Sequence, residues 1–204
     1  MSTQRPLIVG DDAGPQPPYP LRMEGKVISG FGRGSKELGI PTANLPVDDT
    51  VTPWISSVKS GVYFGYASIL LPPPAQADGG AQQDEDAQQA GSSTDERGFR
   101  IFPMVMSIGY NPFYKNTVRS AEVHVLHDFK SDFYGTHMRL LVLDFVREEK
   151  NYDSLDDLVL DIRTDCDVAR ASLARKSWAP ARAKVVDGGD VDGELDVEWL
   201  LKDL

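Results

Sequence analysis

The chain has 204 residues, 41% of them hydrophobic, and a formal net charge of −10 at pH 7. This length fits one folded domain with appendages, and no run approaches the ~18–20 apolar residues of a membrane-spanning helix. Residues 72–98 hold six acidic residues against one basic, and residues 177–204 hold seven against three. The rest is therefore nearly neutral, which argues against the basic surface that nucleic-acid binding usually needs.

The single cysteine, Cys166, cannot form an internal disulfide. The first residues do not resemble a secretory signal, because two acidic residues follow a short apolar patch. Together these features predict an intracellular protein that needs no oxidising compartment. We expect it in the cytoplasm, with a mitochondrial association left open.

Taken in chain order, five segments favour β-strands, because they are rich in β-branched and aromatic residues between turn-forming residues. They cover residues 24–29, 61–71, 99–108, 120–126 and 138–146. The fourth alternates most clearly, with Ala121, Val123 and Val125 on one face and Glu122 on the other. Pro103 predicts a bulge or a sheet edge in the third.

The hydrophobic period then changes, and apolar residues recur at helical spacing from Leu155 to Leu173. Ser154 and Asp157 resemble a capping box at the start of this helix, and Trp178 marks its end. Several short strands followed by one helix predict a mainly β fold, a small closed antiparallel barrel with the helix packed on it.

Three segments lie outside this pattern. We expect residues 1–20 to be a flexible N-terminal extension, residues 72–98 a disordered insertion and residues 179–204 an acidic tail. The insertion is polar, of low complexity and without aromatic residues, and it separates two apolar segments. The barrel domain is then expected to span residues 21–178.

The stretch GFGRGSKELGIPTAN, residues 30–44, is the densest in functional signals. Its four glycines allow main-chain N–H groups to approach an anion closely, and Lys36 adds positive charge. A flexible turn between strands explains the composition about equally well. The stretch is not a Walker loop, because Gly-Lys-Ser is absent and Pro41 stops a helix from opening behind it.

This stretch resembles the signature of riboflavin kinases, above all in the Pro-Thr-Ala-Asn of residues 41–44. The similarity continues through GVYFGYASI (61–69), SIGYNPFYKNTVRSAEVHVLHDFKSDFYG (107–135), REEKNYDSL (147–155) and the helix. It covers roughly residues 21–71 and 99–176. The resemblance implies a six-stranded antiparallel barrel that transfers the γ-phosphoryl group of Mg-ATP to riboflavin, giving FMN and ADP.

The resemblance also implies a metal site and a catalytic base. Thr42 and Asn44 would hold Mg²⁺, with Zn²⁺ or Mn²⁺ as alternatives, beside the ATP phosphates. Mg²⁺ prefers oxygen ligands, and residues two apart in an extended chain project to the same side. Glu122 matches the glutamate of the family that accepts the hydroxyl proton. Read without the resemblance, Thr-x-Asn is more often a turn, and a strand glutamate is more often solvated.

Further substrate contacts follow from the resemblance alone. Gly30 and Lys36 would contact the ATP phosphates or their loop. The nucleotide side would contain Val125, His127 and Tyr134, and the flavin side Arg147, Lys150 and Tyr152. The alternative for His127 is a satisfied surface histidine. For Arg147 and Lys150 it is simple ion pairs with Glu148, Glu149 or the acidic start of the helix.

We therefore expect a monomeric riboflavin kinase whose partners are riboflavin, FMN, ATP and ADP, without nucleic acid or a membrane span. The alternative is a barrel that binds flavin or nucleotide without turnover. An enzyme that also makes FAD would need a second nucleotide-binding domain, for which the roughly twenty residues before the barrel are too few.

Overall fold

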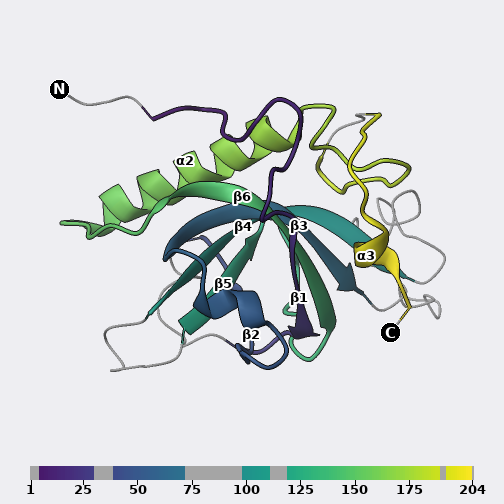
Figure 1. Cartoon of the computed structure of the whole chain (residues 1–204). Helices are drawn as coiled ribbons and strands as arrows, with labels where there is room; N and C mark the ends of the chain where they lie inside the picture. Colours follow the sequence, from purple (N-terminus) through teal and green to yellow (C-terminus); the bar gives the residue numbers. More distant parts are fainter. Residues whose placement is uncertain (1–4, 30–38, 72–97, 111–118, 189–191, 204) are drawn as a thin grey trace, which may run out of the picture.

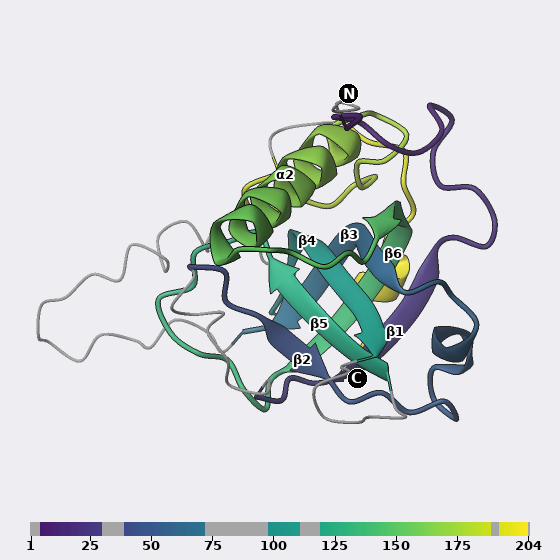
Figure 2. The ribbon, with the colours of Figure 1, turned by 90° about the vertical axis from the view of Figure 1, so that its left-hand side faces the viewer.

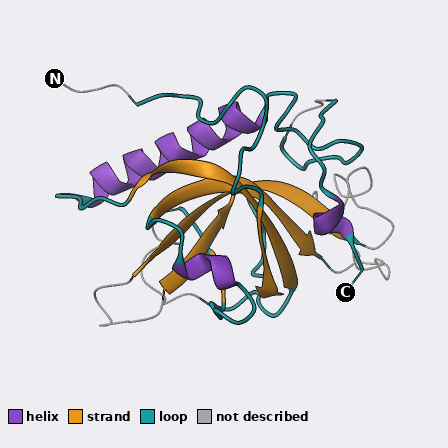
Figure 3. Ribbon diagram, viewed as in Figure 1, coloured by secondary structure: helices purple, strands orange, loops and turns teal. Residues whose placement is uncertain are grey.

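The computed structural model describes residues 5–29, 39–71, 98–110, 119–188 and 192–203. These residues form six strands, one 3-10 helix and two α-helices (Figure 3). The elements are β1 (Leu21–Lys26), β2 (Ala43–Leu45), η1 (Pro53–Ser56), β3 (Gly61–Leu70), β4 (Phe99–Tyr110), β5 (Arg119–Val125), β6 (His137–Glu148), α2 (Leu155–Leu173) and α3 (Glu198–Leu201).

The strands form one antiparallel sheet in the order β1-β6-β3-β4-β5-β2. The sheet curls into a half-barrel, and α2 crosses one face of it (Figures 1 and 2). The predicted mainly β fold, with six antiparallel strands and one long C-terminal helix, is confirmed. The predicted closure of the barrel is not. The strands β1 and β2 lie at the two ends of the sheet, and β2 has only three residues. Among the described residues one bridge links these two ends, between Ile28, two residues after β1, and Asn44 of β2.

Side chains alternate between two hydrophobic clusters, one within the curl of the sheet and one beneath α2. On β5 the buried Ala121, Val123 and Val125 belong to the cluster within the curl. Because successive strand residues point to opposite faces, Glu122 and His124 lie on the face that α2 partly covers. The alternation predicted from the sequence thus places these two polar side chains outside the inner core.

The helix α2 begins as the capping pattern predicts. The hydroxyl of Ser154 accepts a hydrogen bond from the backbone N–H of Asp157 at 3.1 Å, a contact worth about 1 kcal/mol. Cys166 is a buried free thiol on the apolar side of the helix. The helix ends at Leu173, before the expected end at Trp178, and two turns follow it.

The segment before β1 lies along α2 (Figure 1). The backbone N–H of Val9 donates to the hydroxyl of Ser172 at 3.0 Å, and the indole of Trp178 donates to the carbonyl of Asp11 at 2.9 Å. The guanidinium of Arg175 also donates to the carbonyl of Val9. Composition gave no sign of these contacts, since backbone groups make most of them.

The C-terminal residues pack against the sheet near the start of β6. Leu200 of α3 is fully buried. The guanidinium of Arg139, also buried, donates to the carbonyls of Lys202 and Asp203 and to a carboxylate oxygen of Glu24 at 3.0 Å. One buried cation of β6 thereby joins β1 to the end of the chain.

Several predictions fall on residues that the structure does not describe. They include Gly30, Lys36 and, except for Gly98, the insertion at 72–98. In the part of the chain that is described, no helix is long and apolar enough to cross a membrane.

Candidate functional site

The candidate site is a row of polar side chains across three neighbouring strands. Asn44 of β2 pairs with Glu122 of β5, and Glu122 pairs on its other side with Ser107 of β4. Directly opposed residues of antiparallel strands have Cβ atoms about 4.5–5.5 Å apart. The fold therefore brings together Asn44 and Glu122, the residues expected to bind metal and to accept a proton, although 78 positions separate them in the sequence.

The side chain of Asn44 carries an unsatisfied acceptor. The residue is only 6% exposed, and among the described residues nothing donates a hydrogen bond to its amide oxygen, Oδ1. Leaving a buried oxygen without a partner costs about 1–3 kcal/mol, so a water molecule or a bound ion is expected to satisfy it. Thr42, two residues earlier, is half-buried and precedes β2.

These oxygens suit a hard divalent cation. The described residues contain no cluster of three His, Cys, Asp or Glu side chains that could hold a metal by themselves. A site with one or two neutral protein oxygens is typical of Mg²⁺ that also binds phosphates and water. The residues present at Thr42 and Asn44 therefore fit a metal that arrives with a nucleotide.

The carboxyl of Glu122 is in an environment that favours its protonated form. Burial, and next the negative charge of Glu149, raise its pKa above the ordinary value. Glu149 follows β6 and accepts a hydrogen bond from Ser107 at 3.4 Å. A side chain at position 109 would clash with this carboxylate, because a Cβ on Gly109 would lie 2.1 Å from its Oε1. The glycine thus makes room for a second acidic group beside Glu122.

His124 connects this face of β5 to the segment before β2. Its Nδ1 lies 2.8 Å from the carbonyl oxygen of Pro41, the residue before Thr42. A carbonyl only accepts, so Nδ1 carries the proton. Burial lowers the pKa of His124, which keeps the ring neutral at neutral pH. The sequence assigned this histidine no role, yet it holds the Pro-Thr-Ala-Asn segment against β5.

The three residues expected on the nucleotide side lie at the end of β5 and in the segment after it, and the backbone N–H of His127 donates to the carbonyl of Val125 at 2.8 Å. Val125 is buried in the inner cluster, on the opposite face from Glu122. The ring of His127 packs on aromatic residues, and its Nδ1 lies 2.7 Å from a carboxylate oxygen of Asp187. Tyr134 is 47% exposed. Within the described contacts none joins these residues to the Asn44–Glu122 pair.

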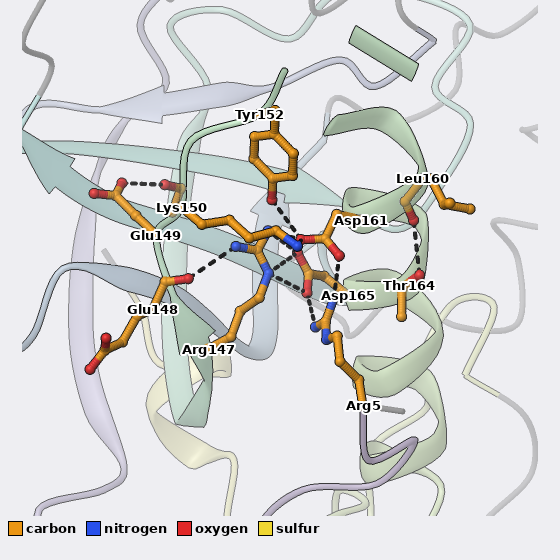
Figure 4. A network of polar contacts seen from close by, with 11 residues as sticks. Arg5, Arg147, Glu148, Glu149, Lys150, Tyr152, Leu160, Asp161, Thr164 and Asp165 are labelled. Carbon is orange, nitrogen blue, oxygen red and sulfur yellow. Dashed lines mark hydrogen bonds and ion pairs between the residues drawn. The ribbon is translucent and has the colours of Figure 1, made fainter. Parts of the chain in front are cut away.

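The three residues expected on the flavin side do meet, through two aspartates of α2 (Figure 4). Arg147 donates from Nε and Nη2 to the carboxylate of Asp165, with Nη2 at 2.8 Å. Asp161 accepts from Lys150 Nζ at 2.8 Å and from the hydroxyl of Tyr152 at 2.6 Å. The ion-pair alternative for the two cations is thus realised, although mid-helix aspartates, four residues apart, supply the carboxylates.

The pKa of Asp161 reflects this environment. Burial alone would raise it, but hydrogen bonds from Lys150 and Tyr152, with the charges of Arg147 and Arg5, lower the pKa to about 2. The carboxylate therefore stays ionised and keeps its partners in place over the whole neutral range.

Comparison with known proteins identifies the class to which this site belongs. The family model described as flavokinase, riboflavin kinase, matches residues 17–173, more than half of the chain. The chain therefore belongs to the riboflavin kinase family and is a kinase.

Individual relatives agree with this assignment. The chain is 59% identical to the riboflavin kinase of Pyricularia oryzae, over 99% of this chain and 96% of that protein. It is 57% identical to the riboflavin kinase of Chaetomium globosum, over 97% of this chain and 93% of that protein. Its fold is similar to the crystal structure of riboflavin kinase from Trypanosoma brucei, with a TM-score of 0.53 and 26% identity, covering 78% of this chain and 82% of that one.

Sequence reasoning missed four residues of this region: Ser107, Glu149, Asp161 and Asp165. The spacing of Asp161 and Asp165 was a usable signal, because residues four apart share one face of a helix. The role of Ser107 had no local signal, since only the strand register places it beside Glu122.

Proposed function

We propose that this protein transfers the γ-phosphoryl group of Mg-ATP to the terminal ribityl hydroxyl of riboflavin, giving FMN and ADP. The observation that carries the proposal is the pairing of Asn44, whose buried amide oxygen has no described partner, with Glu122, whose pKa is raised. A metal ligand and a proton acceptor side by side are what phosphoryl transfer to an alcohol requires. Membership of the riboflavin kinase family supports the identity of the acceptor.

Thr42 and Asn44 hold the metal in this proposal. The metal, Mg²⁺ with Zn²⁺ or Mn²⁺ as alternatives, supplies positive charge to the phosphate oxygens when bound. Asn44 contributes its amide oxygen and Thr42 its hydroxyl. Gly30 and Lys36, which lie outside the described residues, are proposed to contact the ATP phosphates.

Glu122 acts as the general base. The hydroxyl oxygen of riboflavin forms the bond to the γ-phosphorus, the bond from phosphorus to the β–γ bridging oxygen breaks, and ADP leaves with that electron pair. Glu122 takes the hydroxyl proton. A base works best when its pKa lies near the working pH, and burial with the nearby charge of Glu149 shifts Glu122 in that direction.

The two substrates are proposed to approach from different sides of this row. The nucleotide side is assigned to Val125, His127 and Tyr134. The flavin side is assigned to Arg147, Lys150 and Tyr152. The flavin-side residues lie together, because all three contact Asp161 or Asp165 of α2.

The remaining proposals concern the whole molecule. We propose a monomer in the cytoplasm, with a barrel domain at 21–178 flanked by an N-terminal extension and an acidic tail. A closed barrel requires the two ends of the sheet, at β1 and β2, to meet. The bridge between Ile28 and Asn44 already joins these ends at one point.

Product formation tests the proposal directly. The purified protein is incubated with riboflavin and Mg-ATP, and the flavins are separated chromatographically. We expect FMN and ADP in equal amounts. Folded protein that binds riboflavin and ADP but forms no FMN would identify a non-catalytic binding barrel instead.

A further inference from the structure

Arg5 reaches the region of the proposed flavin site from outside the family-matched residues. The match begins at residue 17, and Arg5 lies in the segment that runs along α2. Its Nη1 donates to Asp161 at 2.9 Å, and its Nη2 pairs with the carboxylate of Asp165 (Figure 4). One guanidinium thus bridges both aspartates of α2.

The aspartates that Arg5 bridges are poorly hydrated. The side chain of Asp161 is 13% exposed and that of Asp165 is 2% exposed. Carboxylates removed from water depend on their hydrogen-bonded cations, and losing one partner of a buried pair is far more costly than losing a surface pair. Arg5 and Arg147 share Asp165, so the N-terminal segment, α2 and the end of β6 meet at this carboxylate.

The segment that carries Arg5 is also held at a second place, away from the two aspartates. Side chains at the C-terminal end of α2 and just after it bind the backbone of Val9, Asp11 and Asp12; they are Ser172, Arg175, Ser177 and Trp178. Because the chain is already fixed there, less conformational entropy is lost when Arg5 binds the two aspartates. The ion pairs of Arg5 with Asp161 and Asp165 are therefore preorganised.

From this geometry we infer that Arg5 is a positioning residue for the kinase reaction. It fixes the carboxylate of Asp161, which in turn holds Lys150 and Tyr152, and thereby orders residues 147–152. The inference rests on the proposed function, in which this segment borders riboflavin. Residues 147–152 also include Glu149, which lies near Glu122. An ordered conformation of this segment therefore affects both riboflavin binding and the general base Glu122.

The test compares Arg5→Ala with wild type, with Arg5→Lys as a conservative rescue and Arg163→Ala as control. Arg163 is an exposed arginine of α2, the helix that carries Asp161 and Asp165. Its loss removes one positive charge and leaves the contacts of the two aspartates in place. We expect Arg5→Ala to raise the KM for riboflavin by roughly 3- to 10-fold, the effect of removing one member of a coupled network. The KM for ATP should change less than twofold, and Arg5→Lys should recover part of the loss.

Hydrogen exchange of the ligand-free protein provides a readout that needs no turnover. In Arg5→Ala, amides of residues 148–153 should exchange faster than in wild type, while the central strands β3 and β4 stay unchanged. Equal rises in both KM values, or unchanged exchange in 148–153, would overturn the role of Arg5. A wild type that forms no FMN would instead refute the proposed function, so the two failures are distinguishable.

Discussion

Replacing Glu122 by Gln is the most decisive perturbation of the proposed mechanism. The substitution keeps the size of the side chain and removes the group that can accept a proton. General-base catalysis contributes about 10²–10⁴-fold, which corresponds to about 3–5 kcal/mol of activation free energy. We expect kcat to fall by that factor, while the KM values for riboflavin and ATP change little, because the lost interaction forms in the transition state.

The same substitution should not destabilise the protein at neutral pH. Burial and Glu149 raise the pKa of Glu122 in the folded state, so folding favours its protonated form. The favourable contribution is complete below the unfolded pKa of about 4.3 and is lost as the pH rises through the folded pKa. Gln does not ionise, so Tm should be equal to or higher than that of wild type at pH 7–8.

Glu148→Gln is the matched control, because Glu148 has a side chain 74% exposed at the end of β6. It should leave kcat and Tm near wild type. Steady-state kinetics and thermal unfolding are measured on the same preparations. Near-normal kcat in a folded Glu122→Gln protein, or a clear loss of Tm with normal turnover, would refute the general-base role and favour a structural carboxylate.

Three further predictions follow from the same geometry. Thr42→Ala and Asn44→Ala should each raise the Mg²⁺ concentration that gives half-maximal ADP binding, measured by calorimetry; unchanged metal dependence in both would place the metal elsewhere. Glu149→Gln should lower the pKa of Glu122 by removing a like charge, so the acid limb of the kcat–pH profile should move to lower pH; a shift to higher pH would contradict the assignment. Deleting residues 74–96 should leave turnover within a fewfold of wild type. The strands on either side, β3 and β4, pair with each other up to Leu70 and Phe99, and loop entropy grows slowly with length. Loss of activity by orders of magnitude in a folded deletion variant would show that the insertion is functional.

Predictions from the sequence agreed with the structure where they depended on residues close together in the chain. Local signals located the long strands well: the segment predicted at 61–71 is β3 at Gly61–Leu70, and that at 99–108 is β4 at Phe99–Tyr110. The three-residue strand β2 was not among the predicted segments. The first strand was misplaced by three residues, since β1 ends at Lys26 and residues 27–29 continue without a ladder. No bulge occurs at Pro103, since the pairing of β4 with β3 runs through it without a register shift; the pairing with β5 begins at the next residue, Met104.

Composition and period determined the mainly β fold, the α2 cap at Ser154 and the face on which Glu122 lies, because each depends on residues within a few positions of one another. Tertiary structure decided which of these polar residues meet. The strand order put Asn44 beside Glu122, and packing of α2 on the sheet put Asp161 and Asp165 against Arg147 and Lys150. The contact with Arg5 spans 156 positions. Such pairings depend on how separate elements dock, and no local pattern of residues encodes that arrangement.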